Sequence, residues 1–315
     1  FALDNIAFRP RVLRDVENVD LSVDLFGHNL KMPVILAPIG SMQDFVDGAG
    51  TAPTLAASEF GIMHMISSTC MPGLEEVAKS VNYPKLFQLY VRGNKDWVDD
   101  NIKNAMDHNY AGICLTVDLD AYGRRERDLA KRYRTTSRQS ASGFEHQMRF
   151  SWKDIDRIKS YCNLPIIIKG IATKEDALLA VEHGVEVVYV SNHGGRQLDY
   201  GLGGLNVLPE ISESIGDNAK VIFDGGIMRG TDVVKAIALG ADCVGVGRLQ
   251  GFAAAAGGSK AIVRMLELLE LEISTALRLL GVNSIFDLDD TYLSKDYSFG
   301  KLSALSAFPL IDEGY

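Results

Sequence analysis

Short apolar runs recur along the chain, and segments with the periodicity of amphipathic helices separate them. Runs such as 185–190 are rich in β-branched and aromatic residues, which favours strands in the interior of a sheet. The pattern predicts strands at residues 33–37, 61–67, 85–90, 112–117, 164–169, 185–191, 220–224 and 243–247.

Capping signals mark the helices between the last strands. Thr173 and Thr231 each begin a predicted helix, and Gly184 and Gly240 follow the ends of these helices. Threonine before a helix and glycine after it are preferred because they satisfy the unpaired backbone groups at the two ends. Asp176 lies three residues after Thr173 and forms a weak capping box. A strand and helix unit that repeats eight times predicts a (β/α)8 TIM barrel, and an open doubly wound sheet is the alternative.

The composition is that of an ordinary globular protein, with 47% hydrophobic and 23% charged residues. We expect one barrel domain over residues 1–315. The net charge of -9 and the pI of about 5.2 argue against nucleic acid or an anionic membrane as a partner, so any bound anion requires a local arginine cluster. No apolar run has the length of a membrane span, and the N-terminus lacks a signal-peptide pattern, so the predicted compartment is the cytoplasm.

The four cysteines show no spacing that is typical of metal binding. Neither a CxxC motif nor a Cys/His pattern is present, and most of the cysteines lie in apolar, strand-like runs. We therefore predict no metal site and four reduced core cysteines: Cys70, Cys114, Cys162 and Cys243.

The apolar run at 185–190 ends in Ser-Asn-His-Gly-Gly-Arg, a cluster of residues that can each take part in chemistry. Gly194 and Gly195 allow a tight turn and let a flat ligand approach the backbone. His193 is a candidate base because histidine titrates nearest to neutral pH, and Arg196 is a candidate clamp for a carboxylate. A strand-end histidine beside a surface arginine is the alternative interpretation.

Most other predicted strands also end in hydrogen-bonding or charged groups. Barrel enzymes place their chemistry at the carboxyl ends of the strands, so these groups predict a site there. The last two ends, Asp-Gly-Gly and Gly-Arg, resemble the phosphate-binding loops that barrels form after strands seven and eight. The strand ends contain Pro38, Ile39, Gly40, Ser67, Gln88, Tyr90, Thr116, Asp118, Lys169, Ser191, Asp224, Gly225, Gly226, Gly247 and Arg248.

These motifs resemble the FMN-dependent 2-hydroxy acid oxidase and dehydrogenase family, which includes glycolate oxidase, lactate oxidase, flavocytochrome b2 and mandelate dehydrogenase. The resemblance runs almost from end to end, and its most specific part is Ser-Asn-His-Gly-Gly-Arg-Gln-Leu-Asp at 191–199. It also includes Phe-Arg-Pro-Arg-Val-Leu at 8–13, Phe-Gln-Leu-Tyr-Val at 87–91, Leu-Thr-Val-Asp at 115–118 and Gly-Arg-Arg-Glu at 123–126. The resemblance implies an enzyme that uses FMN to oxidise an (S)-2-hydroxy acid to the 2-oxo acid.

The resemblance also implies roles for the polar residues. His193 is the catalytic base, and Asp118 holds its imidazolium, because a neighbouring carboxylate stabilises a protonated histidine. Arg196 binds the substrate carboxylate with Arg125 as a supporting charge, and Tyr90 binds a substrate oxygen. His193 takes either the hydroxyl proton during hydride transfer or the Cα proton in a carbanion mechanism, and the choice stays open because both routes need the same base.

By the same resemblance, Lys169 lies near N1 and the C2 carbonyl of the flavin, where a cation favours the anionic reduced form. A lysine that follows Ile-Ile-Ile at 166–168 also needs an anionic partner in an apolar wall. The expected FMN-binding residues are Pro38, Ile39, Gly40, Ser67, Gln88, Tyr90, Thr116, Lys169, Ser191, Asp224, Gly225, Gly226, Met228, Arg229, Gly247 and Arg248.

Three features depart from the family pattern. Met228 stands where the family has an arginine that binds the FMN phosphate. Arg229 is a candidate substitute, and Arg248 with the backbone amides is expected to carry more of the phosphate interaction. The loop at 132–147 is polar and shorter than is common, and we expect it to be mobile. Family members also have a segment ahead of the position of Phe1, with a tyrosine that helps bind the carboxylate.

Three residues bear on the electron acceptor and the substrate. Gly40 lies where oxidases of the family commonly have alanine and mandelate dehydrogenases have glycine, which favours a dehydrogenase with a quinone or cytochrome as acceptor. An oxidase that uses oxygen is the alternative. Thr69 replaces a tryptophan of glycolate oxidase and Tyr122 replaces a smaller residue, so we expect medium, long or aromatic substrate side chains. A solvent-facing Tyr122 is the other interpretation.

Two classes of function therefore remain open. The favoured class is a flavoenzyme that acts on a small 2-hydroxy acid, because the catalytic and substrate-binding residues are intact. The other class is a degenerate barrel that binds a flavin or phosphate without turnover, which the methionine at position 228 would fit. The predicted assembly is a homo-oligomer such as a tetramer.

Overall fold

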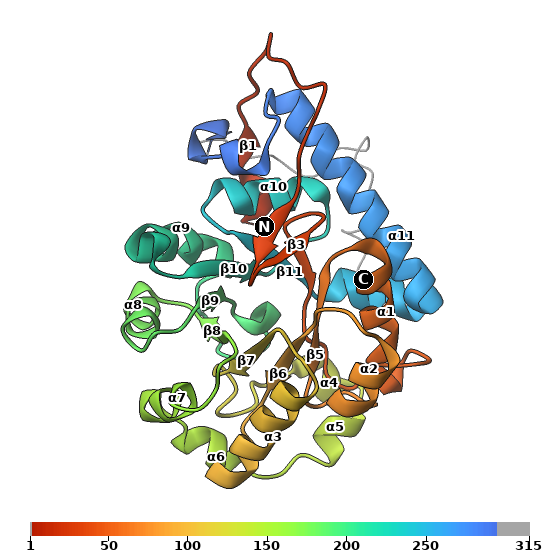
Figure 1. Cartoon of the computed structure of the whole chain (residues 1–315), viewed down its shortest axis with the longest axis vertical. Helices are drawn as coiled ribbons and strands as arrows, with labels where there is room; N and C mark the ends of the chain where they lie inside the picture. Colours follow the sequence, from red (N-terminus) through yellow and green to blue (C-terminus); the bar gives the residue numbers. More distant parts are fainter. Residues whose placement is uncertain (1, 295–315) are drawn as a thin grey trace.

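Eight parallel strands close into a barrel at the centre of the protein, and the computed structural model describes residues 2–294 around it (Figure 1). The strands follow one another in chain order, and the last of them pairs with the first. They are β4 (Val34–Leu36), β5 (Met63–Ser67), β6 (Leu86–Leu89), β7 (Gly112–Thr116), β8 (Ile166–Ile171), β9 (Val187–Val190), β10 (Lys220–Asp224) and β11 (Cys243–Val246). The predicted TIM barrel is confirmed, and its closure excludes the open sheet.

Helices surround the barrel (Figure 1). They are α1 (Thr51–Phe60), α2 (Leu74–Ser80), α3 (Lys95–Asp107), α7 (Trp152–Lys159), α8 (Lys174–Glu182), α9 (Gly204–Ile215), α10 (Gly230–Ala238) and α11 (Arg248–Leu280). The predicted cap of α8 is confirmed, because the Thr173 hydroxyl accepts a hydrogen bond from the Asp176 amide at 3.3 Å. Helix α10 begins one residue before the predicted Thr231, with Arg229 in the N-cap position.

Smaller elements fill the connections. Strand β1 (Ala7–Phe8) pairs with β12 (Leu293–Ser294), and β2 (Val23–Leu25) forms a hairpin with β3 (His28–Leu30). The long connection after β7 contains α4 (Glu126–Ala130), α5 (Thr136–Gln139) and α6 (Phe144–Arg149), so the loop predicted at 132–147 includes helical turns. Short 3-10 turns lie at Leu3–Asn5, Met42–Asp44, His193–Gly195, Gly216–Asn218, Ile285–Asp287 and Asp290–Tyr292.

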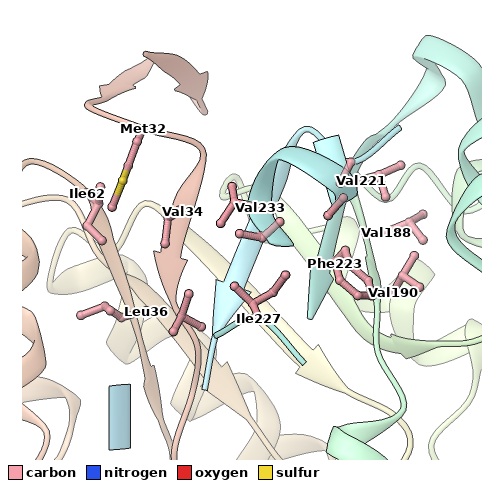
Figure 2. Packing of buried hydrophobic residues seen from close by; sticks show 14 of the residues in the cluster. Met32, Val34, Leu36, Ile62, Val188, Val190, Val221, Phe223, Ile227 and Val233 are labelled. Carbon is pink, nitrogen blue, oxygen red and sulfur yellow. The ribbon is translucent and has the colours of Figure 1, made fainter. Parts of the chain in front are cut away.

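Both faces of the barrel strands are buried, which is why their sequences read as continuous apolar runs. Side chains on the outer face pack beneath the helices, and Figure 2 shows members of this cluster on several strands. The inner face is filled by Ile35, Met65, Cys114, Ile167, Tyr189, Ile222 and Cys243.

The four cysteines are buried and free, as predicted. Within residues 2–294, no helix is long and apolar enough to cross a membrane. The same residues contain no group of three or more His, Cys, Asp or Glu side chains arranged to hold a metal ion. The predicted domain runs to residue 315, and residues 295–315 lie outside the described part of the chain.

The interior of the barrel predicts a destabilising substitution at Gly245. A Cβ at this position would overlap the hydroxyl of Tyr189, which is fully buried and has no room to move. We expect Gly245→Ala to lower the free energy of unfolding by about 1 to 3 kcal/mol, the usual cost of overpacking. Urea unfolding of the purified protein measures it.

Two further variants test the cause of this effect. Gly201→Ala lies in an exposed loop and should change stability by less than about 0.5 kcal/mol. Tyr189→Phe removes the overlapping hydroxyl and should recover part of the loss when combined with Gly245→Ala. Equal losses for the two glycine variants would contradict the proposed contact.

Candidate active site

The predicted site residues lie at the carboxyl ends of the barrel strands or in the loops that follow them. Lys169 and Gln88 belong to strands, and Arg125 lies just before α4. The others occupy strand ends and loops: Pro38, Ile39, Gly40, Ser67, Tyr90, Thr116, Asp118, Ser191, His193, Arg196, Asp224, Gly225, Gly226, Met228, Arg229, Gly247 and Arg248.

A buried lysine ties together the ends of three neighbouring strands. The Lys169 ammonium of β8 donates to the Ser191 hydroxyl at 2.8 Å and lies 3.2 Å from the Asp224 carboxylate. Ser191 in turn donates to Asp224 at 2.6 Å. Burial lowers the pKa of Lys169, but the carboxylates of Asp224 and Asp118 outweigh this effect and hold the pKa above its ordinary value. The lysine therefore remains charged at neutral pH.

A histidine and a carboxylate form a second, partly buried pair beside this lysine. Nδ1 of His193 lies 2.9 Å from Oδ1 of Asp118. Burial raises the pKa of the Asp118 carboxyl, but the hydrogen bond and charge of His193 outweigh it and hold the pKa below its ordinary value. Because Asp118 occupies Nδ1, the other ring nitrogen, Nε2, is directed towards the Tyr90 hydroxyl at 3.4 Å. His193 is therefore oriented as a proton acceptor at Nε2.

The backbone brings these two side chains together. His193 has a positive φ of 57°, and its amide donates to the Ser191 hydroxyl at 3.1 Å. Gly170 in β8 has a φ of 111°, and a Cβ there would lie 2.7 Å from the Asp118 Cβ. Only glycine allows this close approach, so β8 can place Lys169 beside the His193 and Asp118 pair.

Two arginines lie on the outer side of the histidine. Arg196 pairs with Asp128 at 3.3 Å, and about half of its side chain is exposed. Arg125 donates weakly to Gln197 at 3.5 Å, and its Nε is buried without a hydrogen-bond partner among the described residues. Burial lowers the pKa of Arg125, and the positive charge of Arg196 lowers it further. Two mutually repelling guanidinium groups make a suitable site for a carboxylate.

The side-chain oxygen of Gln88 tests whether a flavin fits at the strand ends. Gln88 is fully buried, and its amide nitrogen donates to the Thr116 hydroxyl at 2.9 Å. Its Oε1 has no hydrogen-bond partner among the described residues. A buried acceptor without a partner is costly, and the ring N–H between the two carbonyls of a flavin is a donor that would satisfy it. The residues therefore fit the isoalloxazine.

The ends of β10 and β11 fit a phosphate. Gly225 and Gly226 have φ values of 127° and 78°, at which a larger residue would be strained. Gly247 precedes α11, which is interrupted by non-helical backbone at Gly257 and Gly258, and the N-terminus of its first segment favours an anion. Arg248 begins this helix, and its guanidinium donates to the Gly194 carbonyl at 3.4 Å. Arg248 therefore lies between the phosphate loops and the His193 loop.

Arg229 is turned away from these loops. Its guanidinium makes two hydrogen bonds to Glu272 of α11, at 2.7 and 3.1 Å. Glu272 also accepts a hydrogen bond from the Gly230 amide at 2.7 Å. The amides of Met228 and Arg229 both donate to Asp232. This ion pair joins α10 to α11 and competes with the predicted use of Arg229 at the phosphate, which stays a prediction.

Thr69 follows β5 and Tyr122 follows β7, and β6 lies between these two strands. A Cβ on Gly40 would overlap the Thr69 hydroxyl, so this hydroxyl fills the space that the missing methyl group leaves. The Tyr122 ring packs edge-on against Phe144 of α6, with 5.2 Å between the ring centroids. Tyr122 is only partly exposed, which disfavours the interpretation that it faces solvent.

Several residues that support the site are not among the predicted site residues. Gln147 of α6 is buried, accepts from the Val91 amide at 2.9 Å and donates to the Thr116 carbonyl at 3.3 Å. Gln197 donates to the Asp118 carbonyl at 2.8 Å. The Tyr189 ring lies beneath the Lys169 ammonium at 5.1 Å. Gln197 belongs to the motif at 191–199, whereas Gln147 lies in a polar loop that has no distinctive pattern.

A closed barrel with a buried lysine, a His-Asp pair and a glycine phosphate loop defines a flavin-dependent oxidoreductase. A profile of the FMN-dependent dehydrogenase family matches residues 1–295. The peroxisomal (S)-2-hydroxyacid oxidase GLO3 of Arabidopsis thaliana is 36% identical and the L-lactate oxidase of a Nostoc strain is 34% identical. These alignments cover 91% and 92% of this chain and 84% and 87% of the relatives. A solved structure of mandelate oxidase with (S)-mandelic acid is 33% identical, with a TM-score of 0.87, over 95% of this chain and 88% of that one.

The chain therefore belongs to the family of FMN-dependent 2-hydroxy acid oxidases and dehydrogenases. It is an oxidoreductase, and FMN is its cofactor. The compartment and the assembly stay predictions.

The phosphate loops predict different effects for two neighbouring arginines. Arg248→Met removes a charged donor at the N-terminus of α11 and should raise the dissociation constant of FMN roughly 10- to 100-fold, the scale of a charge-assisted hydrogen bond. Arg229→Met should change FMN binding by less than about threefold and lower the thermal unfolding temperature, because Glu272 loses its partner. Fluorescence titration of the apoprotein with FMN measures both constants. Equal weakening by the two substitutions would make Arg229 a phosphate ligand.

Proposed function

We propose that this protein oxidises (S)-2-hydroxy acids with medium, long or aromatic side chains to 2-oxo acids and passes the electrons to oxygen. The observation that carries the proposal is the orientation of His193. Its Nδ1 is held by the partly buried Asp118 at 2.9 Å, and its Nε2 is directed towards the Tyr90 hydroxyl at 3.4 Å. A base fixed in this way next to a phenol and two arginines is suited to a hydroxy acid.

Each side chain has a separate role in the proposed reaction. Arg196 and Arg125 bind the substrate carboxylate through parallel hydrogen bonds. Burial raises the pKa of Tyr90 far above neutrality, so its hydroxyl stays protonated and donates to a substrate oxygen. The substrate loses two electrons and two protons, and one of these protons goes to Nε2 of His193. Asp118 stabilises the imidazolium that forms. FMN, when bound, supplies the acceptor for the two electrons and for the other proton.

The rim residues support a preference for larger side chains. Thr69 is small, and the packed position of Tyr122 supports its use as one wall of the pocket. Burial of apolar surface contributes about 25 cal/mol per Å². An additional ~100 Å² on the substrate side chain therefore contributes about 2.5 kcal/mol, which is enough to separate mandelate from glycolate.

The choice of oxygen rests on Gly40 and on the relatives. The expectation of a dehydrogenase depended on extra space beside Gly40, but the Thr69 hydroxyl lies where the additional methyl group would be. Several of the similar proteins carry the name oxidase, among them those that act on lactate and mandelate. We therefore favour oxygen over a quinone or a cytochrome.

Anaerobic bleaching of the bound flavin tests the proposed function. Glycolate, lactate, 2-hydroxyoctanoate and mandelate are added in turn to the yellow holoenzyme, and kcat/KM is measured from the loss of colour. We expect kcat/KM for mandelate or 2-hydroxyoctanoate to be about tenfold or more above kcat/KM for glycolate, because the larger substrates bury additional apolar surface. A steady preference for glycolate would contradict the open pocket, and the absence of bleaching would leave a flavin-binding barrel without turnover. Air is then admitted, and rapid return of colour with stoichiometric peroxide identifies oxygen as the acceptor.

The base is tested by His193→Ala. This variant should retain FMN and reduce the flavin about 10² to 10⁴ times more slowly, the usual contribution of a general base. Stopped-flow absorbance measures the rate. His183→Ala is the matched control, because His183 also pairs with a carboxylate, Asp156, but lies at the end of α8 outside the site. Near-normal reduction by His193→Ala would remove this residue from the mechanism.

A further inference from the structure

Aromatic rings and arginines alternate along one side of the site, leading away from His193. The Arg92 guanidinium lies between the rings of Tyr90 and Phe144, at 5.6 and 4.2 Å from their centroids. Phe144 in turn packs against Tyr122. The guanidinium groups of Arg125 and Arg138 lie 5.3 and 5.1 Å from the centre of the Tyr122 ring. We call Arg92, Tyr122, Arg138 and Phe144 the outer wall.

The arginines of the outer wall lack acidic partners. Among the described residues, neither Arg92 nor Arg138 forms an ion pair with a carboxylate, whereas the nearby Arg124 and Arg196 each do. Both side chains are only partly exposed. Burial lowers the pKa of Arg92, and Arg138 is close enough to Arg125 to lower the pKa of that residue. Uncompensated, half-buried positive charge is unfavourable unless an anion joins it.

The carboxylate that every 2-hydroxy acid carries already has two arginines of its own. Arg125 and Arg196 suffice for it, since one guanidinium can bind a carboxylate with two hydrogen bonds. Arg92 is separated from His193 by the Tyr90 ring, and Arg138 lies against the Tyr122 ring. These two charges are therefore available to a different group of the substrate.

We propose that Arg92 and Arg138 form a second anion subsite, which binds a carboxylate at the far end of the substrate side chain. The inference rests on the proposed function and narrows its substrate class to 2-hydroxy acids with a second acidic group. Tyr122 and Phe144 pack against the carbon chain between the two carboxylates. Guanidinium groups stacked on aromatic faces keep their N–H edges available, and Arg92 uses one nitrogen to donate to the Val91 carbonyl at 3.2 Å.

The test compares acids that differ only in the distal charge. The substrates are 2-hydroxyglutarate and 2-hydroxyadipate, each paired with the derivative in which the distal carboxylate is an amide. For each pair, kcat/KM is measured by anaerobic bleaching of the holoenzyme. In the pair that fits the subsite better, we expect kcat/KM for the acid to be about tenfold or more above kcat/KM for its amide. The reason is that a charge-assisted hydrogen bond is stronger than a neutral one. A ratio near one or below it in both pairs would overturn the subsite.

Substitutions identify which arginine distinguishes the acid from the amide. Arg92→Gln and Arg138→Gln should each reduce the ratio of acid to amide by about tenfold, and Arg92→Lys should keep part of it because the charge remains. Arg149→Gln is the matched control on the same connection, since Arg149 is an exposed residue of α6. Its ratio should equal that of the unmodified protein. A ratio that persists in both glutamine variants would show that other residues bind the distal group.

A binding measurement separates the failure of this inference from the failure of the proposed function. If none of the hydroxy acids bleaches the flavin, oxidation of this substrate class is wrong. Calorimetric titration of the holoenzyme with 2-oxoglutarate and its distal amide then decides the subsite without turnover. Tighter binding of the dicarboxylate that Arg138→Gln removes supports the subsite, and equal dissociation constants overturn it.

Discussion

The charge of Lys169 determines how the carboxyl end of the barrel is built. Only 5% of this side chain is exposed, so its ammonium has lost almost all of its hydration and depends on nearby anions. Asp224 at the end of β10 and Ser191 after β9 contact the ammonium directly. The negative charge of Asp118 after β7 also stabilises it. Removal of one partner from such a buried pair typically costs about 3 to 5 kcal/mol, so the strand ends are fixed relative to one another.

The same arrangement explains why the carboxylate beside His193 stays ionised. Asp118 faces both Lys169 and His193, and these two groups keep its carboxyl ionised despite burial. When His193 takes up a proton, Asp118 balances the new charge, and Asp224 pairs with Lys169. The permanent cation and the cation that forms during the reaction therefore each have a carboxylate beside them. Gly170 makes this possible, because any larger residue would separate Asp118 from β8.

The sequence predicts this part of the site well because topology alone brings it together. Each barrel strand is a continuous apolar run, and parallel strands in a closed barrel must end at the same face. Polar residues that follow such runs, such as Gln88, Lys169 and His193, therefore share a site wherever the detailed boundaries fall. The boundary of β8 is an example, since the strand extends to Ile171 through an irregularity after Lys169 without moving the lysine from the site.

The parts that the sequence does not predict depend on packing between distant side chains. Arg229 follows the phosphate loop, but its orientation is decided by Glu272, which lies 43 positions later in α11. The space beside Gly40 is decided by the side chain of Thr69 on another strand end. Neither contact produces a periodic pattern in the sequence, because each one joins two single residues rather than the apolar faces of two helices or strands. Expectations about the acceptor and the phosphate ligand are therefore the ones that depend most on such single contacts.

A net charge of -9 makes the local arginines decisive for recognition. At physiological ionic strength, charges more than about 8 Å apart in solvent are largely screened, so the acidic surface as a whole neither attracts nor strongly repels a small anion inside the rim. Partly buried charges are screened much less. Because Lys169 is paired with Asp224, the positive potential near the substrate comes from Arg92, Arg125 and Arg138, which are held against aromatic rings. Recognition of an acidic substrate therefore depends on these arginines, and the pair of His193 and Asp118 is left to handle the proton.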